Sequence, residues 1–198
     1  MSKTFQRAEE RLLSAIGAAR VSHAFFISSL DPEPAVRLAR RAAALVCTGE
    51  ADEARLAQSA GFRAYDGASM RIDDIRELIA GLAQSPLNGQ MRCTLIEAAH
   101  GMSIPVQNAL LKTLEEPSSS AVFILTGNIA GVLPTVASRC AVIRAGLSSA
   151  SEIESLLLSR GASPAEARFY AAAGGGSETR ALRLYEDDTF RTLRDDSL

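Results

Sequence analysis

Residues 103–117, which read SIPVQNALLKTLEEP, limit the possible folds of this chain most strongly, because they contain a helix start, a helix body and a helix end. Ser103 is a favourable N-cap residue, and Pro105 falls in the first turn, where a missing N–H group costs little. Pro117 disfavours the helical conformation at Glu116, so we expect the helix to end there. The apolar residues of the body recur at helical spacing and predict one buried face: Val106, Leu110, Leu111 and Leu114. The polar residues are expected mostly off that face: Gln107, Lys112, Glu115 and Glu116.

Two short apolar runs flank this helix, at 94–96 and 122–125, and each is bounded by polar or turn residues. We interpret both runs as buried strands. A strand, a helix and a second strand in that order imply a parallel pair with a right-handed crossover, in a sheet that helices cover on both faces. Many α/β domains share this pattern, so it predicts a fold class and no function.

The literal sequence of this region is more specific than its pattern. Residues 108–117 (NALLKTLEEP), followed by a strand and then by Ser138-Arg139-Cys140, closely resemble the clamp-loader branch of the AAA+ ATPases. Within that branch the chain looks most like the delta-prime subunits of bacterial DNA polymerase III, strongly over 62–144 and more weakly elsewhere. The resemblance implies a P-loop-NTPase-like core domain at 1–145, with a five-stranded parallel sheet flanked by helices, and a small all-helical lid domain at 146–198.

Clamp-loader subunits of this type normally continue into a third, all-helical collar domain that holds the assembly together. No such segment follows the lid in this sequence, so we expect either a fragment or a naturally short form, monomeric or weakly associated by itself. The resemblance also implies partners: an ATP-hydrolysing subunit of the gamma or tau type, a delta-like subunit and, through the complex, the sliding clamp and primer–template DNA.

The other elements are predicted from apolar spacing and from turn residues. Strands are expected at 24–27, 62–65, 93–97, 122–126 and 141–144. Helices are expected at 4–19, 34–46, around 73–78 and, in the lid, from near 147 to about 193. The helix around 73–78 should bury a stripe of four residues: Ile72, Ile75, Ile79 and Leu82. Asn88-Gly89 predicts the turn into the strand at 93–97.

Composition limits the class of protein. With 198 residues, 47% hydrophobic content and a formal charge of −2, the chain is expected to be a soluble globular protein. No apolar stretch approaches the length of a membrane span, and residues 1–11 lack the apolar run of a signal peptide, so we expect a cytoplasmic location. The near-neutral charge argues against independent DNA binding, and we interpret Arg37, Arg40 and Arg41 as part of a solvated helix face.

The three cysteines, Cys47, Cys93 and Cys140, are far apart and form no C-x-x-C pair, so the sequence predicts neither a disulfide framework nor a zinc cluster. Many bacterial members of the resembled family carry a cysteine-rich zinc module directly after the helix at 34–46. This chain has only Cys47 and a short, partly acidic segment there, so we expect the module to be missing. No metal or other cofactor is predicted.

Residues 28–34, Ser-Ser-Leu-Asp-Pro-Glu-Pro, occupy the position at which the resembled family binds nucleotide phosphates. A P-loop requires glycines whose N–H groups cradle phosphate, a lysine for the β- and γ-phosphates, and a hydroxyl for Mg²⁺. This segment has no glycine and no lysine, but it has two prolines and two carboxylates. The whole chain contains only two lysines, Lys3 and Lys112, and neither follows a glycine. We therefore expect no conventional nucleotide site and no ATPase activity.

The strand at 93–97 ends where active family members carry two adjacent acids, one for Mg²⁺ and one that orients water. Here Glu97 takes the first position and Ala98 the second, so the catalytic glutamate is absent. We interpret Glu97 as a polar residue at a strand end, and Asn128, at the family's phosphate-sensing position, as a loop cap. Arg180 lies one residue later than the arginine of the lid's sensor motif, and we assign it no nucleotide role.

Ser138-Arg139-Cys140 carries the functional prediction. In the resembled family the arginine of this motif acts on the nucleotide of a neighbouring subunit, and a guanidinium presents a permanently charged fork that suits phosphate. We predict that Arg139 is an arginine finger that acts in trans, with Ser138 and Cys140 completing the motif, and that its side chain is solvent-accessible. The implied function is that of a non-hydrolysing, delta-prime-like subunit that helps to load the sliding clamp onto primed DNA.

Two other interpretations are compatible with parts of the sequence. One is an active P-loop NTPase of the helicase-motor or helicase-loader type, against which residues 28–34 and the lysine count argue. The other is a doubly wound binding domain unrelated to replication, for which both motifs would be chance matches. Co-purification with an ATP-hydrolysing clamp-loader subunit would separate the three.

Overall fold

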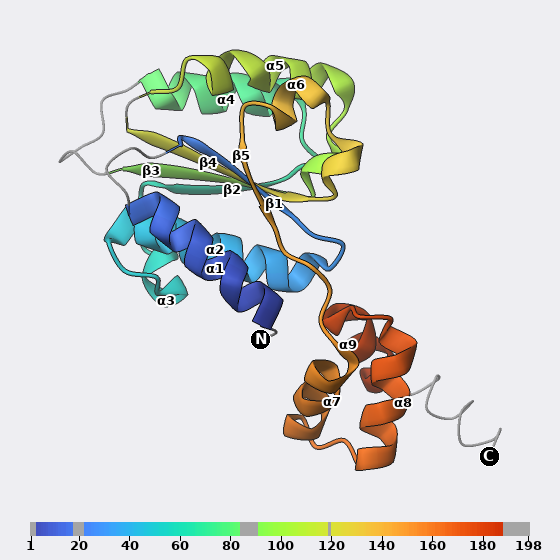
Figure 1. The fold of residues 1–198 in the computed structure, drawn as a ribbon. Helices are drawn as coiled ribbons and strands as arrows, with labels where there is room; N and C mark the ends of the chain where they lie inside the picture. Colours follow the sequence, from blue (N-terminus) through green and yellow to red (C-terminus); the bar gives the residue numbers. More distant parts are fainter. Residues whose placement is uncertain (1–2, 18–21, 84–90, 119, 188–198) are drawn as a thin grey trace.

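The computed structural model describes residues 3–17, 22–83, 91–118 and 120–187. Within these ranges five parallel strands form one sheet in the order β2-β3-β4-β1-β5 (Figure 1). The strands are β1 Ala24–Ser28, β2 Phe62–Asp66, β3 Arg92–Glu97, β4 Ala121–Gly127 and β5 Ala141–Arg144. All five expected strands are therefore present, and the expectation of a parallel sheet is confirmed.

Helices cover both faces of this sheet (Figure 1). One face carries α1 Lys3–Gly17, α2 Pro32–Thr48 and α3 Glu53–Leu56. The other face carries α4 Ile72–Ala83, α5 Ile104–Glu115 and α6 Pro134–Ala137. The short 3₁₀ turns η2 Ala99–Gly101 and η3 Ile129–Gly131 follow β3 and β4. The fold is thus the helix-covered α/β arrangement that the sequence predicts.

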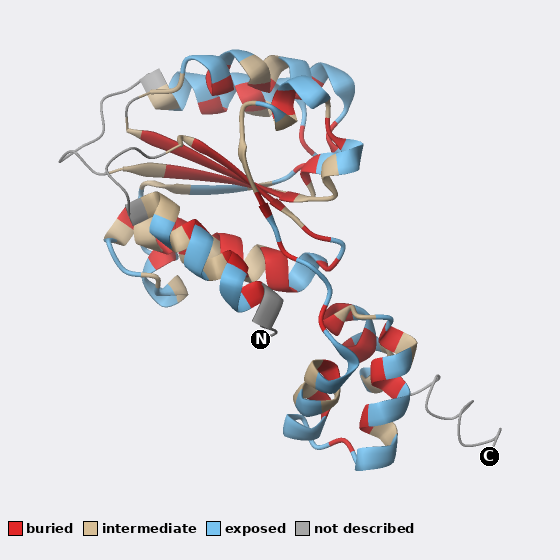
Figure 2. Cartoon of the chain, viewed as in Figure 1, coloured by how far each residue is buried: buried red, intermediate tan, exposed pale blue. Residues whose placement is uncertain are grey.

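The sheet is buried on both faces because each face packs against helices. Successive side chains of β1 point to opposite sides. Phe25 and Ile27 join the apolar cluster under α1 and α2, whereas Ala24 and Phe26 join the cluster under α4 and α5. Figure 2 shows buried residues along the central strands and on the helix faces turned toward them. The strands that read as apolar runs are therefore the interior of the protein.

Helix α5 lies where its sequence predicts, between Ser103 at the N-cap and Glu116 at the C-cap. Two details of the expectation are wrong. The side chain of Ser103 makes no capping hydrogen bond, and Gln107, expected off the buried face, is only 3% exposed. A glutamine can be buried at little cost when both ends of its amide are hydrogen-bonded, and the contacts described below satisfy both.

Helix α4 buries only part of the expected stripe. Ile75 and Leu78 are buried, whereas Ile72 and Ile79 are 38% and 40% exposed. Helix α4 contacts α5 on one flank, and its buried residues join the cluster that lies over β3 and β4. Only a narrow face of the helix therefore meets the core, and two of the four expected residues lie at its rim.

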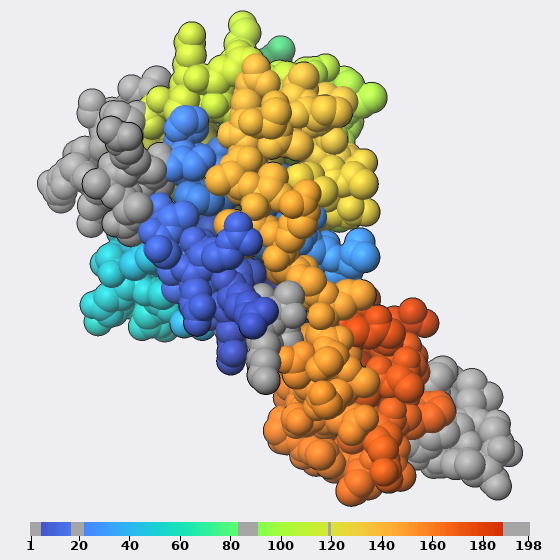
Figure 3. Space-filling model, viewed as in Figure 1, coloured from blue at the N-terminus to red at the C-terminus, as the bar shows by residue number. Residues whose placement is uncertain are grey.

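Three helices follow β5: α7 Ala150–Ser159, α8 Pro164–Gly174 and α9 Glu178–Glu186. Their apolar residues form a third cluster around Tyr170, apart from the two clusters of the sheet. Helices α7 and α8 both begin with a capping box, formed by Ser149 with Glu152 and by Ser163 with Glu166. In Figure 3 this group of helices forms a lobe that projects from the sheet-containing part. The helices expected after residue 146 are present, and the division into two domains stays a prediction.

Some expectations fall outside the described residues. These are the turn at Asn88-Gly89 and the last two residues of the first expected helix. The last helix was expected to reach about residue 193, but α9 ends at Glu186, and the next residue, Asp187, has an extended backbone. No helix in the described ranges combines the length and the apolar character that crossing a membrane requires.

Candidate functional site

Residues 29–31 connect the end of β1 to the start of α2. In P-loop proteins the N–H groups at this helix start bind phosphate. Helix α2 begins at Pro32 and not at the expected Pro34, since a proline is well suited to the first helical turn. Neither proline has an N–H group, so the first turn of α2 offers fewer donors to an anion than a P-loop does.

Asp31 is the N-cap residue of α2, and its side chain does not cap its own helix. Asp31 is 1% exposed, and its carboxylate caps α9 instead. The backbone N–H groups of Glu178 and Thr179 donate to Oδ2 at 2.6 and 3.4 Å, and the hydroxyl of Thr179 donates to Oδ1. A carboxylate at a helix N-terminus is favourable because it accepts from unpaired N–H groups and lies at the positive end of the helix dipole. A carboxylate that stands at the start of α2 therefore caps the start of α9.

Glu178 extends this joint between α9 and the sheet-containing part. Its side chain is buried and accepts a hydrogen bond from the Ser148 hydroxyl at 2.7 Å. Nη2 of Arg37, on α2, lies 3.8 Å from the other carboxylate oxygen. The backbone N–H of Ser148 donates to the carbonyl of Gly176 at 2.9 Å. The start of α9 is thus held by polar contacts from α2, from the β1–α2 connection and from the segment after β5.

Glu97 ends β3, at the position of the family's metal-binding acid. Nη2 of Arg40, on α2, donates to its Oε1 at 2.7 Å. The next residue is Ala98, which has no carboxylate. Its backbone is in the left-handed conformation, with φ at 47°. Among the residues that the structure describes, no group of three or more His, Cys, Asp or Glu side chains could hold a metal ion. Glu97 is a strand-end acid whose charge is offset by a guanidinium.

The three arginines of α2 are each paired with an acid from another element. Their side chains are about two-fifths exposed, so they are partly solvated, as expected, but each also forms an ion pair. The pairs are Arg37 with Glu178, Arg40 with Glu97 and Arg41 with Glu9. Because their charge is offset, these residues form no free basic patch for a phosphate backbone.

Asn128 caps the short turn η3, as expected. Its Oδ1 accepts from the N–H of Ala130 at 3.0 Å, and its own N–H donates to Nδ1 of His100 at 3.4 Å. The neighbouring Gly127 has a φ of 138°, and a Cβ there would lie 2.4 Å from the His100 ring. This position therefore requires glycine, and His100 has a structural contact that accounts for its presence.

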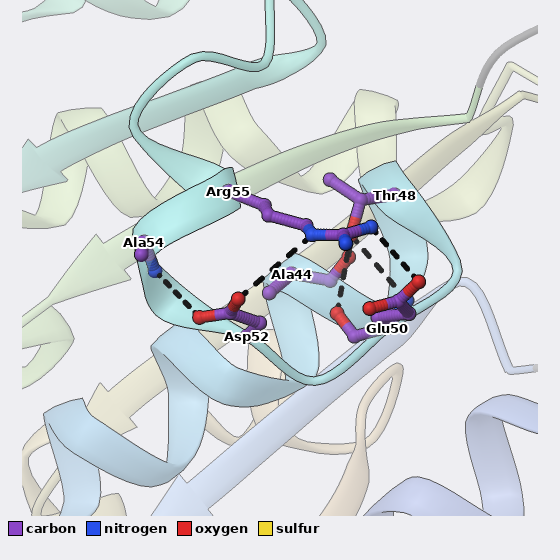
Figure 4. Close-up of polar contacts among 6 residues, drawn as sticks. All are labelled: Ala44, Thr48, Glu50, Asp52, Ala54 and Arg55. Atoms are coloured by element: carbon purple, nitrogen blue, oxygen red, sulfur yellow. Dashed lines mark hydrogen bonds and ion pairs between the residues drawn. The ribbon is translucent and has the colours of Figure 1, made fainter.

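The segment between α2 and α3, where the family places a zinc module, is a short closed corner (Figure 4). The Thr48 hydroxyl donates to the carbonyls of Ala44 and Glu50, and Arg55 pairs with the carboxylates of Glu50 and Asp52. Cys47 is buried in the cluster under α1 and α2. That the zinc module is missing stays a prediction.

Arg139 lies in the corner between α6 and β5. Its Nη1 donates to the carbonyl of Thr135 at 2.8 Å, and its Nη2 forms an ion pair with Oε1 of Glu115, at the end of α5. The side chain is 33% exposed, so it is accessible as expected but only in part. The hydroxyl of Ser138 also donates to the Thr135 carbonyl, at 3.1 Å, which closes the turn. The motif therefore presents a guanidinium that two contacts hold in place.

Cys140, the last residue of the motif, packs against the cluster under α5. Burial raises the pKa of its thiol from 9.0 to about 12. The thiol is thus protonated at neutral pH, and its role in the motif is packing and not nucleophilic chemistry.

Arg139 and the β1–α2 connection lie at opposite ends of the sheet. Phe25, near the start of β1, pairs with Ala141, which begins β5 directly after the motif. Asp31 follows the other end of β1. Since a strand rises about 3.3 Å per residue, Phe25 and the end of β1 are roughly 10 Å apart, and the two sites lie beyond these two points. Arg139 is therefore not brought to the phosphate position of its own chain.

Gln107, in the first turn of α5, links this helix to the start of α6. Its Oε1 accepts from the N–H of Leu133, directly before α6, at 2.7 Å, and its Nε2 donates to the carbonyl of Met102 at 3.0 Å. Sequence reasoning missed this role, because a glutamine beside an apolar stripe reads as surface unless its partners are known. Arg180 is exposed and its backbone N–H donates to the N-cap Ser177; that it has no nucleotide role stays a prediction.

Comparison with known proteins agrees with the resemblance drawn from the motifs. The model of the family described as "DNA polymerase III, delta subunit" matches residues 5–146. The DNA polymerase III subunit delta' of Pseudomonas aeruginosa is 36% identical over 119 residues, which are 59% of this chain and 36% of that protein. The subunit tau of Escherichia coli is 39% identical over 77 residues, 38% of this chain and 12% of that protein. The chain thus spans about a third of the length of its first relative.

Two solved structures from Thermotoga maritima share the fold. A gamma subunit-related protein of DNA polymerase III has a TM-score of 0.58 and 23% identity, and the match covers 89% of this chain and 58% of that one. The RuvB Holliday junction branch migration motor also has a TM-score of 0.58, with 15% identity and coverage of 90% and 59%. At such identities the likeness describes the architecture alone.

Proposed function

The chain belongs to the DNA polymerase III delta-subunit family, and from this membership we propose that it is a non-hydrolysing, delta-prime-like subunit of a clamp loader. In this role it helps to place the sliding clamp on primed DNA. Residues 1–145 act as the AAA+ core domain with a degenerate nucleotide site, and the helices after residue 146 act as the lid. The proposed partners are an ATP-hydrolysing subunit of the gamma or tau type and a delta-like subunit, with clamp and DNA engaged through the complex, in the cytoplasm.

One observation carries the non-hydrolysing assignment: the buried carboxylate of Asp31 occupies the start of α2 and is committed to the N-terminus of α9. A triphosphate placed there would meet a like charge and two prolines, and it would find no lysine. Arg40 in turn binds Glu97, which removes the free carboxylate that Mg²⁺ needs. An active NTPase with an aberrant loop is disfavoured on the same grounds.

The position of Arg139, at the end of the sheet opposite the β1–α2 connection, supports a trans role for this residue. The residue is far from the phosphate position of its own chain, and three of its five N–H donors are not used by the contacts to Thr135 and Glu115. A guanidinium with free donors at a surface corner suits the phosphate of a neighbouring subunit. A binding domain unrelated to replication would give no reason for this arrangement.

The first test of this function is calorimetry of the isolated chain with Mg-ATP, for which no binding is expected. Micromolar affinity would contradict the assignment.

The second test is ATP hydrolysis by the assembled loader carrying Arg139→Ala in the full-length subunit. Arginine fingers contribute about 10³ to 10⁵ in rate at a single site, and the loss should be smaller for a complex with several sites. Arg139→Lys should restore little, because an ammonium cannot form the bidentate fork. Arg76→Ala, at an exposed arginine of α4, serves as the matched control. Wild-type rates for Arg139→Ala in an intact complex would return Arg139 to a surface role.

A further inference from the structure

The two sequence motifs of this chain meet in space. Helix α5, which is formed by the first motif, contacts the segment that carries the second motif. One contact lies near the start of the helix and the other at its end. At the start, Gln107 accepts from the N–H of Leu133 at 2.7 Å. At the finish, Glu115 binds the guanidinium of Arg139. The corner between α6 and β5 is therefore built on α5.

Glu115 is an unfavourable residue for the helix in which it lies. It is the last residue of α5, where the helix dipole is negative and an acidic side chain is disfavoured. Glu116 follows it with a second acid. The pair with Arg139 offsets this cost for Glu115, and the structure describes no side-chain partner for Glu116. Glu115 thus has a specific reason to be acidic that helix formation does not supply.

The contacts also limit the orientation of the guanidinium. Nη1 is held by the carbonyl of Thr135 and Nη2 by the carboxylate of Glu115, so the plane of the group is set by two anchors. A free arginine side chain would lose considerable rotamer entropy on binding a phosphate, and an ordered one loses less. The pair is exposed to solvent, with 33% of Arg139 and 46% of Glu115 accessible. An exposed pair of this kind is weak, so the guanidinium can be shared with an incoming phosphate.

We propose that Glu115 is a positioning residue for Arg139, which orders the guanidinium before it engages the nucleotide of the neighbouring subunit. This inference rests on the proposed trans role of Arg139. Glu115 touches no substrate and acts only through the arginine. The competing idea, that Glu115 holds Arg139 away from the neighbour as an inhibitory latch, predicts the opposite change in rate.

The test uses the assembled loader with a full-length subunit carrying Glu115→Gln, which keeps the shape of the side chain and removes its charge. We expect kcat for clamp- and DNA-stimulated ATP hydrolysis to fall roughly three- to tenfold, since small misplacement of a catalytic group has large effects on rate. KM for ATP should change less than about twofold, because a finger acts mainly in the transition state. Glu115→Asp should recover part of the rate. Glu116→Gln removes the same charge one residue later and should behave as wild type.

Arg139→Ala and the double variant separate this inference from the proposed function. If Arg139→Ala lowers kcat and the double variant is no worse, the two residues act as a unit, as we expect. If Arg139→Ala lowers kcat while Glu115→Gln does not, or raises it, the positioning role is wrong and the finger assignment stands. If Arg139→Ala has no effect, the proposed function itself fails. All variants must share the thermal unfolding midpoint of the wild type. If Glu115→Gln lowers both the midpoint and kcat, Glu115 is merely structural and the positioning role is wrong.

Discussion

Asp31 is the residue whose removal tests most directly how the start of α9 is held. In Asp31→Ala the N–H groups of Glu178 and Thr179 and the hydroxyl of Thr179 lose their acceptor at a buried position. The free energy of unfolding should fall, and the loss should be concentrated in α9 and in the third apolar cluster, because these groups open first when the cap is removed.

The magnitude can be bounded from the contacts. Hydrogen bonds to a charged group contribute about 1.5 to 3 kcal/mol each. The sum over the three hydrogen bonds is therefore an upper limit, and the net loss of stability should be smaller. Removing the carboxylate also relieves the cost of burying its charge, and loss of a helix cap alone costs about 0.5 to 2 kcal/mol. We expect Asp31→Ala to destabilise the protein by about 3 kcal/mol. Asp31→Asn, which keeps one acceptor oxygen but no charge, should cost roughly half as much.

The assay is urea unfolding together with hydrogen exchange of the α9 amides. Asp52→Ala is the matched control, since Asp52 is an N-cap aspartate in solvent that accepts from Ala54 at 3.0 Å. It should cost less than about 1 kcal/mol. A loss below about 0.5 kcal/mol for Asp31→Ala, with unchanged exchange at the start of α9, would refute the view that this carboxylate holds α9.

Two further predictions concern the supports of the motif. Gln107→Ala leaves the N–H of Leu133 without its acceptor and should cost about 1 to 3 kcal/mol in urea unfolding. Gln107→Glu keeps that acceptor, but it buries a charge and turns a second oxygen toward the carbonyl of Met102, so it should cost at least as much, and a smaller loss would contradict this account. Because burial raises the pKa of the Cys140 thiol from 9.0 to about 12, its alkylation by iodoacetamide should keep rising with pH up to about 12. The same shift means that stability is fully present below pH 9.0 and is lost between 9.0 and about 12, as the unfolded thiol ionises first. Alkylation that levels off near pH 9 would contradict the raised pKa of the Cys140 thiol.

Elements with a strong local signal were predictable from sequence. Helix α5 begins after Ser103 and ends at Glu116, because the cap residue and the prolines act on their own turns. The strands are apolar runs bounded by polar residues, and burial on both faces of a parallel sheet produces that pattern. The wrong details are those that depend on neighbours: the exposed Ile72 and Ile79 follow from how α4 lies beside α5.

For the candidate site, the sequence predicted only which nucleotide-binding residues are absent. The absence of a P-loop lysine and of the second acid at Ala98 is visible in any reading of the chain. What replaced them was not visible, because the partner of Asp31 lies 147 residues away. Likewise the arginine motif could be recognised, but its anchor Glu115 read as a surface acid.

The sequence by itself thus determined most of the secondary structure, the class of fold and the absence of a P-loop motif, since each depends on residues within one or two turns of one another. Tertiary structure alone decided the order of the strands, the burial of Gln107 and the pairing of Asp31 with α9 and of Glu115 with Arg139. The physical reason is that a polar side chain is compatible with both surface and interior. Only the donors and acceptors that folding brings within about 3 Å decide which of the two it occupies.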